Sequence, residues 1–211
     1  MQITSPSHEP LAPWIRRHRE RIDEALWSDG HVLFRGFDVG GLAGFEDCAG
    51  SACDALYRHY GDLPLASAGD NVYFATPYPK HLEIRFHNEA SHTRSWPSRQ
   101  LFFCLEPASE GGEWTLSDGR QVIERLPAQM LERFRELGLM YRRRFIRGLD
   151  TSWQQFFKVE SLGELREKIG ASGHGIDAIS ENDLTVSYRT HAVLRIPERG
   201  TEAWFNQILL H

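Results

Sequence analysis

The chain has 211 residues, of which 41% are hydrophobic, 11% aromatic and 25% charged, and its formal net charge is -5. These values are typical of a globular protein, and the length suits one domain, residues 1–211, that buries a core without disulfides. A net negative charge without clustered Lys and Arg excludes a nucleic-acid-binding face, and no apolar run approaches the ~18 residues that a membrane span needs.

The three cysteines, Cys48, Cys53 and Cys104, form no CxxC pair. Free thiols in a reducing cytoplasm fit this pattern, and we expect all three side chains to be buried as small hydrophobes. The first ten residues contain no basic stretch followed by an apolar one, so no secretory signal is expected. The sequence therefore predicts a soluble, cytoplasmic protein and leaves homo-oligomerisation open.

The N-terminal part of the chain predicts two helices around a short strand. Residues 11–27 carry apolar side chains at helical spacings and predict an amphipathic helix that ends near Gly30. Residues 31–34 predict a buried strand, and Gly36 predicts a turn in which a bulkier residue would be strained. A second helix is predicted over residues 44–60.

The next predicted strand, residues 82–89, has an unusually polar face. Its alternation places Glu83, Arg85, His87 and Glu89 on one side. Charged groups avoid burial unless they are paired or bind a metal, so a buried face of this kind indicates a binding site. The alternative is that this face is turned to solvent.

The rest of the chain predicts alternating strands and helices. In chain order these are strands over 101–105 and 113–116, helices over 118–126 (capped by Ser117 or Asp118), 128–137, 151–157 and 161–169, and strands over 139–146, 184–188, 191–196 and 203–210. Residues 170–175 predict a loop, and 197–200 a hairpin turn. The basic run Arg142-Arg143-Arg144 predicts a solvated strand edge. Together these elements predict an α+β fold, an incomplete jelly-roll barrel (double-stranded β-helix) with flanking helices.

His87 and Glu89 are the candidate metal ligands. They are two residues apart, so on an extended backbone both side chains leave the same face. An imidazole nitrogen and a carboxylate oxygen are two of the three ligands in the facial triad that holds non-haem Fe(II) and leaves positions open. A His-x-Glu pair also arises by chance on a surface or in a hydrogen-bonded core, so the pair alone leaves these interpretations open.

Several motifs surround this pair in a fixed order. They are Val-Leu-Phe-Arg-Gly-Phe at 32–37, Phe-His-Asn-Glu-Ala-Ser-His-Thr at 86–93, Trp-Pro at 96–97, Leu-Phe-Phe-Cys-Leu at 101–105 and Gly-Gly-Glu-Trp-Thr-Leu-Ser-Asp at 111–118. This set resembles the taurine dioxygenase-like (TauD/TfdA) family of Fe(II)- and 2-oxoglutarate-dependent oxygenases. It is most similar to the syringomycin-pathway branch, which hydroxylates amino acids in peptide natural-product pathways. The resemblance implies that His87 and Glu89 bind Fe(II), with 2-oxoglutarate and O2 as co-substrates.

This sequence departs from the family pattern in two places. Where the family has Gly-Gly-Glu-Thr, with a Thr hydroxyl that helps to bind 2-oxoglutarate, this chain has Trp114, and Thr115 follows one place later. A one-residue shift turns a strand side chain to the opposite face, so Thr115 takes the role only if a bulge realigns it. The third ligand of the family, a distal His, and the Arg that binds 2-oxoglutarate are expected beyond the chain, which then corresponds to the N-terminal two-thirds of the family's length. His92, His191 and His211 are not expected to replace that ligand.

The function implied by the resemblance is hydroxylation of an unactivated C–H bond in a small substrate, an amino acid that is free or tethered to a carrier protein. Relatives that halogenate have a small residue at the position of Glu89, so Glu89 favours hydroxylation. Glu83 is predicted either to contact a substrate ammonium group or to pair with Arg85, and Phe205 and Asn206 by resemblance line the pocket. Two alternatives stay open: a non-catalytic truncated homologue that binds a partner through an exposed edge, and an unrelated metal-independent binding barrel.

Overall fold

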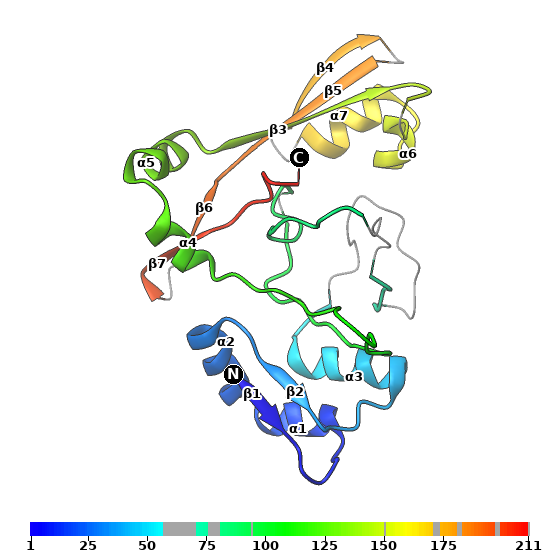
Figure 1. Ribbon diagram of the computed structural model, residues 1–211. Helices are drawn as coiled ribbons and strands as arrows, with labels where there is room; N and C mark the ends of the chain where they lie inside the picture. The colour runs from blue at the N-terminus through cyan, green and yellow to red at the C-terminus, as the bar shows by residue number, and fades with distance from the viewer. Residues whose placement is uncertain are drawn as a thin grey trace. The chain divides into compact units, whose positions relative to one another are not determined.

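The computed structural model describes residues 1–56, 71–75, 81–93, 95–149, 151–170, 174–180, 183–196 and 199–210. They form two compact units, each with its own hydrophobic core (Figure 1). The first unit comprises Met1–Leu82 and Pro97–Thr115, and the second comprises Glu83–Trp96 and Leu116–His211. No helix in the described part of the chain is long and apolar enough to cross a membrane.

The first unit is built from a two-stranded parallel sheet and three helices. Its elements are β1 (Gln2–Thr4), α1 (Leu11–Arg17), α2 (Arg19–Asp29), β2 (Leu33–Arg35) and α3 (Gly41–Ala52). Trp14, Ile15, Phe37 and Cys48 are among the residues of its core. The helix predicted over 11–27 is interrupted at His18, whose ring stacks on Trp14 with centroids 4.1 Å apart.

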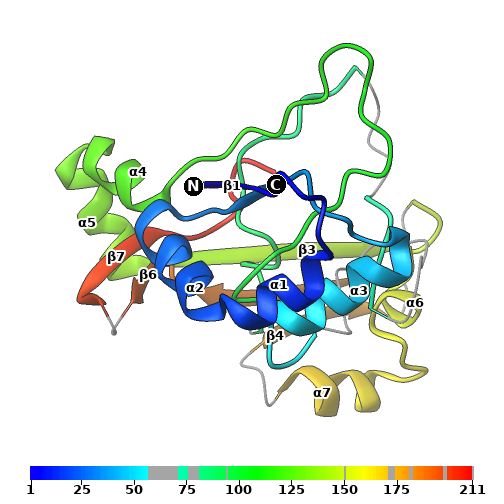
Figure 2. The same cartoon turned by 90° about the horizontal axis from the view of Figure 1, so that it is seen from below.

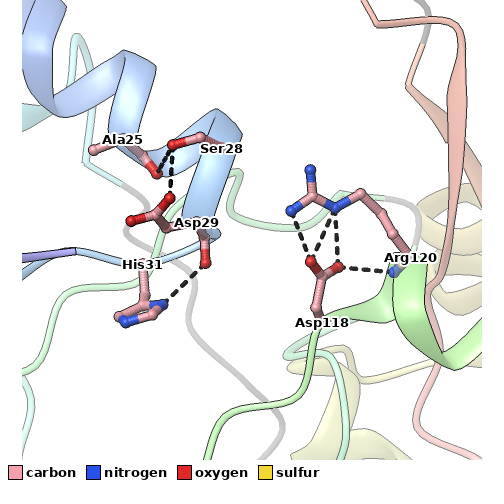
Figure 3. A network of polar contacts seen from close by, with 6 residues as sticks. All are labelled: Ala25, Ser28, Asp29, His31, Asp118 and Arg120. Carbon is pink, nitrogen blue, oxygen red and sulfur yellow. Dashed lines mark hydrogen bonds and ion pairs between the residues drawn. The ribbon is translucent and has the colours of Figure 1, made fainter.

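Local chemistry ends the elements of the first unit as the sequence predicts. Gly30 ends α2 with a φ of 75°, a conformation that favours glycine. Just before it, the Ser28 hydroxyl donates to a carboxylate oxygen of Asp29 at 2.8 Å (Figure 3). Gly36 has a φ of 71°, and a Cβ there would lie 2.6 Å from the carbonyl oxygen of Ser5. The predicted need for glycine in this turn is therefore confirmed.

The second unit contains a three-stranded antiparallel sheet, a hairpin and four helices among its described residues. Its elements are α4 (Gly119–Arg125), α5 (Ala128–Leu137), β3 (Leu139–Ile146), α6 (Trp153–Phe157), α7 (Leu162–Gly170), β4 (His174–Ser180), β5 (Asp183–Thr190), β6 (Val193–Ile196) and β7 (Thr201–Trp204). The sheet has the order β3-β5-β4, and β6 pairs with β7.

One face of the three-stranded sheet is covered by α6 and α7. Both views place α7 beside β4 (Figures 1 and 2). Phe145 and Leu184 from the sheet are buried against Trp153 of α6 and Leu165 of α7. Arg142 and Arg144 lie on the other face of the edge strand β3 and are exposed, as predicted for the basic run. Arg143 is half-buried, because its guanidinium lies over the rings of Phe145 and Phe156.

Two further predictions concern α4 and α5, and both are confirmed. The carboxylate of Asp118 caps α4 by accepting from the backbone N–H of Arg120 at 2.9 Å, and it also pairs with the Arg120 guanidinium at 2.7 Å (Figure 3). Helix α5 follows Pro127 and ends at Gly138, whose φ is 64°.

Three predicted strands are wrong among the described residues. Residues 82–89, 101–105 and 113–116 lie in no strand of a sheet. Most of their apolar side chains are exposed, 58% for Phe102 and 65% for Trp114, whereas Leu101 and Phe103 are half-buried. Alternation predicts an extended backbone, but a strand also needs a partner with free N–H and C=O groups, and none is in place here. The predicted burial of Cys104 is wrong, and Cys53 is only partly buried. Leu33 is also exposed, although its strand β2 pairs with β1.

Two other elements have different bounds in the structure than the sequence predicts. The helix predicted over 44–60 is α3, which ends at Ala52 because Cys53 is extended, while residues 57–60 lie outside the described residues. The loop predicted over 170–175 overlaps the start of β4. All three cysteines are free. The α+β class is confirmed, but the described sheets have two, three and two strands and none closes into a barrel.

Candidate metal centre

His87 and Glu89 lie together in the second unit, on a segment without regular secondary structure that enters a turn at Glu89 and Ala90. Their nearest side-chain atoms are Nε2 of His87 and a carboxylate oxygen of Glu89, 3.4 Å apart. Each side chain is 24% exposed, so the pair is accessible from solvent without being fully hydrated. The structure thus brings the two predicted ligands side by side, although their segment pairs with no strand of a described sheet.

The orientation of the His87 imidazole is set by Nδ1, the ring nitrogen that does not face Glu89. Nδ1 of His87 lies 2.8 Å from the carbonyl oxygen of Arg85. A carbonyl can only accept, so this bond places the proton on Nδ1. In the neutral ring, Nε2 then carries the lone pair that points toward Glu89. Metal-binding histidines commonly have this arrangement, in which a backbone carbonyl fixes the tautomer.

These donor atoms suit a bound cation. A lone pair on Nε2 and a carboxylate oxygen repel each other unless a proton or a metal ion lies between them. With metal–ligand bonds of about 2.1 Å, two adjacent ligands at a right angle are about 3.0 Å apart, which is close to the observed 3.4 Å. The described residues contain no group of three or more His, Cys, Asp or Glu side chains that could hold a metal. It is the 3.4 Å separation of the two donor atoms that fits two ligands of one metal ion.

The residue between the ligands is bonded to a segment far along the chain. The backbone N–H of Asn88 donates to the carbonyl of Asn206 at 3.0 Å, and the side-chain oxygen of Asn88 accepts from the N–H of Asn206 at 3.1 Å. Asn206 is only 3% exposed. Its side-chain amide donates to the carbonyl of Ala192 at 3.0 Å, and its side-chain oxygen accepts from the N–H of Ile208 at 3.3 Å.

The next residue, Gln207, extends this contact. Its backbone N–H donates to the hydroxyl of Tyr141 at 3.1 Å, and its side-chain amide lies 2.7 Å from Nδ1 of His92. Because Nδ1 accepts here, the neutral ring of His92 carries its proton on Nε2. Burial raises the pKa of Tyr141. The turn after the ligand pair is thus attached to both β3 and the segment that follows β7.

The predicted substrate residues lie in different surroundings. Glu83 is exposed and pairs with Arg85 at 3.3 Å, which is the alternative that the sequence left open. Phe205 packs against Trp96 with ring centroids 5.1 Å apart. Asn206 is buried, and both polar atoms of its side chain have protein partners. A contact of any of the three with a substrate stays a prediction.

The predicted 2-oxoglutarate residues belong to the first unit. Trp114 lies against Phe102 with ring centroids 4.1 Å apart, and both Trp114 and Thr115 are exposed. No bulge that realigns Thr115 can be assigned, because residues 113–116 pair with no described strand. His191 is exposed, and His211 lies outside the described residues.

A separate depression of about 510 Å³ lies on the second unit. Helices α4 and α5 and the β6–β7 hairpin line it with charged side chains that include Arg120, Glu132, Arg135, Arg195 and Glu202. None of the predicted site residues lines this depression, so it is not part of the candidate metal centre.

Sequence reasoning missed the roles of Asn88, Tyr141 and Gln207. One signal was present: on an extended backbone Asn88 faces away from its two neighbours, and a polar side chain that turns inward needs a hydrogen-bond partner. The identity of that partner, 118 residues away, could not be read from the sequence.

Comparison with known proteins now gives the family. The family model described as "Taurine catabolism dioxygenase TauD, TfdA family" matches residues 7–208, so the chain belongs to the TauD/TfdA family. This confirms the family resemblance and excludes an unrelated binding barrel. It also supports the α+β prediction, since the family implies a jelly-roll fold.

Two curated relatives match most of the chain. The dapdiamide synthesis protein DdaC of Enterobacter agglomerans is 30% identical over 190 residues, which cover 90% of this chain and 58% of that protein. A clavaminate synthase-like protein of Arabidopsis thaliana is 27% identical over 207 residues, which cover 92% of this chain and 62% of that protein. The chain thus spans about three-fifths of the length of these relatives.

Proposed function

We propose that the chain forms part of a single-domain non-haem Fe(II)- and 2-oxoglutarate-dependent dioxygenase in which His87 and Glu89 are two of the three protein ligands. The observation that carries the proposal is the pair itself. Nε2 of His87 faces the Glu89 carboxylate at 3.4 Å while Nδ1 is engaged by a backbone carbonyl. Membership of the TauD/TfdA family supports the same assignment.

Each residue has a defined part in this proposal. When bound, iron with 2-oxoglutarate supplies the activation of O2 that hydroxylation of a C–H bond needs. His87 offers a neutral nitrogen donor, and Glu89 offers a negative charge that offsets part of the charge of the metal. The third ligand and the Arg that binds 2-oxoglutarate come from outside the described residues. Trp114 is proposed to contact 2-oxoglutarate in the complete site, and Thr115 to do so when a bulge realigns it.

The proposed substrate is an amino acid, free or tethered to a carrier protein. The His-Asn-Glu-Ala-Ser sequence at 87–91 supports the syringomycin-pathway branch, and a relative in dapdiamide synthesis supports a role in the synthesis of a natural product. We assign Phe205 to the substrate side of the site. Glu83 is the candidate for an ammonium group, but to bind one it must leave its ion pair with Arg85.

Anaerobic titration calorimetry with Fe(II) tests the proposal. Wild-type protein should bind one Fe(II), weakly because the described residues supply two ligands, and His87→Ala and Glu89→Ala should each remove the binding. Glu83→Gln is the matched control, because it changes an exposed carboxylate on the same segment that contacts neither ligand, and it should bind as wild type does. No binding by folded wild-type protein, or equal binding by all four proteins, would contradict the proposal.

A second candidate is a homologue that has lost catalysis and binds a partner. The observations that favour it are the missing third ligand among the described residues and the exposed side chains of Phe102 and Trp114. The calorimetric result separates the two functions, because a binding domain has no reason to take up iron at His87 and Glu89.

A further inference from the structure

One residue, Asn88, separates the two candidate ligands His87 and Glu89, and it bonds to a segment far along the chain. Asn88 makes two hydrogen bonds to the backbone of Asn206, one from its N–H at 3.0 Å and one to its side-chain oxygen at 3.1 Å. We call this pair of bonds the Asn88–Asn206 clasp.

Asn206, the partner of Asn88 in the clasp, is buried and makes further hydrogen bonds of its own. Asn206 is 3% exposed, and its own side chain bonds to the carbonyl of Ala192 and the N–H of Ile208. Its neighbour Phe205 donates a backbone N–H to the same carbonyl of Ala192 at 3.0 Å. Ala192 is fully buried. The clasp therefore joins the ligand segment to a buried, hydrogen-bonded part of the second unit.

The turn after the ligands needs such support. Ala90 has a φ of 55°, a conformation that is strained for a residue with a Cβ and persists only where its surroundings impose it. The carbonyl of Asn88 accepts from the hydroxyl of Ser91 at 2.7 Å, and the carbonyl of Ala90 accepts from the N–H of Thr93 at 2.9 Å. Beyond the turn, the contact between His92 and Gln207 fixes the other end.

From these contacts we propose that Asn88 is a positioning residue, which through the clasp sets the separation of His87 and Glu89 and the tautomer of His87. The bond from Nδ1 of His87 to the carbonyl of Arg85 spans two residues, so it forms only while the backbone on both sides keeps its conformation. The clasp fixes that conformation from the C-terminal side. Loss of groups that orient metal ligands commonly lowers metal affinity about 10- to 100-fold. The consequence for the metal rests on the proposed function, but the consequence for the tautomer does not.

Two measurements on the same variants test the proposal. Long-range 1H–15N NMR of the imidazoles in metal-free protein reads the tautomer of His87, and anaerobic calorimetry reads the affinity for Fe(II). Asn88→Leu keeps the approximate volume but removes the acceptor, whereas Asn88→Asp keeps an acceptor and is the conservative control. Leu165→Ala, which leaves a cavity in the core of the same unit far along the chain from the clasp, controls for a general loss of stability.

The expected results separate the possibilities. In wild-type, Asn88→Asp and Leu165→Ala proteins His87 should show the single Nδ1–H form. In folded Asn88→Leu it should show a mixture of both tautomers, and the affinity for Fe(II) should fall at least about tenfold. An unchanged tautomer in Asn88→Leu, or a changed tautomer with an unchanged affinity, would overturn the proposal. If wild-type protein binds no Fe(II), the proposed function fails, and the tautomer alone decides whether the clasp orients His87.

Discussion

The imidazole of His87 has one nitrogen engaged by a carbonyl and the other directed at a carboxylate. Two acceptors that face each other in a half-buried place are unfavourable, so the arrangement suits a metal ion between them. A different hydrogen bond supports the segment that is bonded to the turn after the ligands: the Tyr141 hydroxyl accepts from the backbone N–H of Gln207. Removal of such an acceptor leaves a donor without its partner.

Replacement of Tyr141 by Phe removes only the hydroxyl group that accepts this hydrogen bond. The backbone N–H of Gln207 loses its partner in a buried place, so we expect Tyr141→Phe to lower the free energy of unfolding by about 1–2 kcal/mol. Urea unfolding at neutral pH measures the difference. A variant as stable as wild type would show that the bond contributes nothing to stability.

The pH dependence of that difference has a definite sign. Burial raises the pKa of Tyr141, so the folded state holds the phenolic proton more tightly than the unfolded chain does. The resulting stabilisation is complete below the unfolded pKa of about 10 and is lost as the pH rises through the folded pKa. The gap between wild type and Tyr141→Phe should thus be constant near neutral pH and shrink above about pH 10. A gap that already shrinks near neutral pH would contradict this account.

At the scale of elements, the start of α4 depends on Asp118. Its carboxylate accepts from the first turn and pairs with Arg120, whose hydrogen bond holds the pKa of Asp118 below its ordinary value. Replacement by Ala should cost about 1 kcal/mol, and replacement by Asn less, because Asn also caps helices well.

Asp118 both caps α4 and pairs with Arg120 through its charge, and unfolding at acid pH distinguishes these two contributions to stability. A carboxyl whose folded pKa is lowered contributes stability above its unfolded pKa of about 3.9 and loses it as the pH falls through the folded pKa. The advantage of wild type over Asp118→Asn in urea unfolding should therefore be full near neutral pH and disappear at strongly acid pH. An advantage that does not change with pH would mean that the charge of Asp118 has no part in it.

Elements with local determinants were predictable, and those that need distant partners were not. Asp118, Gly36 and Gly138 act within a few residues, so α4, the turn after β2 and the end of α5 follow from the sequence. Residues 101–105 have the composition of a buried strand, but whether a strand forms depends on a second strand. In the candidate site the spacing of His87 and Glu89 was visible, whereas the clasp between Asn88 and Asn206 was not, because it joins residues 118 positions apart.

At the scale of the whole molecule, each unit combines a packed core with extended segments that no described strand covers. The sheet of the second unit is buried on one face by α6 and α7, while residues 82–86 and 101–105 carry exposed apolar side chains. Exposed apolar groups of this number commonly mark a surface that binds further polypeptide.

Hydrogen exchange followed by mass spectrometry tests this distribution of order. Amides of β3, β5 and α7 should exchange slowly, because they are bonded within a packed core. Amides of residues 82–86, 101–105 and 113–116 should exchange fast, since no described strand pairs with them. Slow exchange in these segments would mean that they form a sheet in solution and that the account of exposed segments is wrong.

The central claim is that His87 and Glu89 hold iron in a site that accepts 2-oxoglutarate. The most direct measurement is the visible metal-to-ligand charge-transfer band that appears when the keto acid chelates Fe(II), recorded under anaerobic conditions in wild-type, His87→Ala and Glu89→Ala proteins. The account predicts a band in wild type that is lost in both variants. A band of equal strength in the variants, or none in folded wild-type protein, would contradict it.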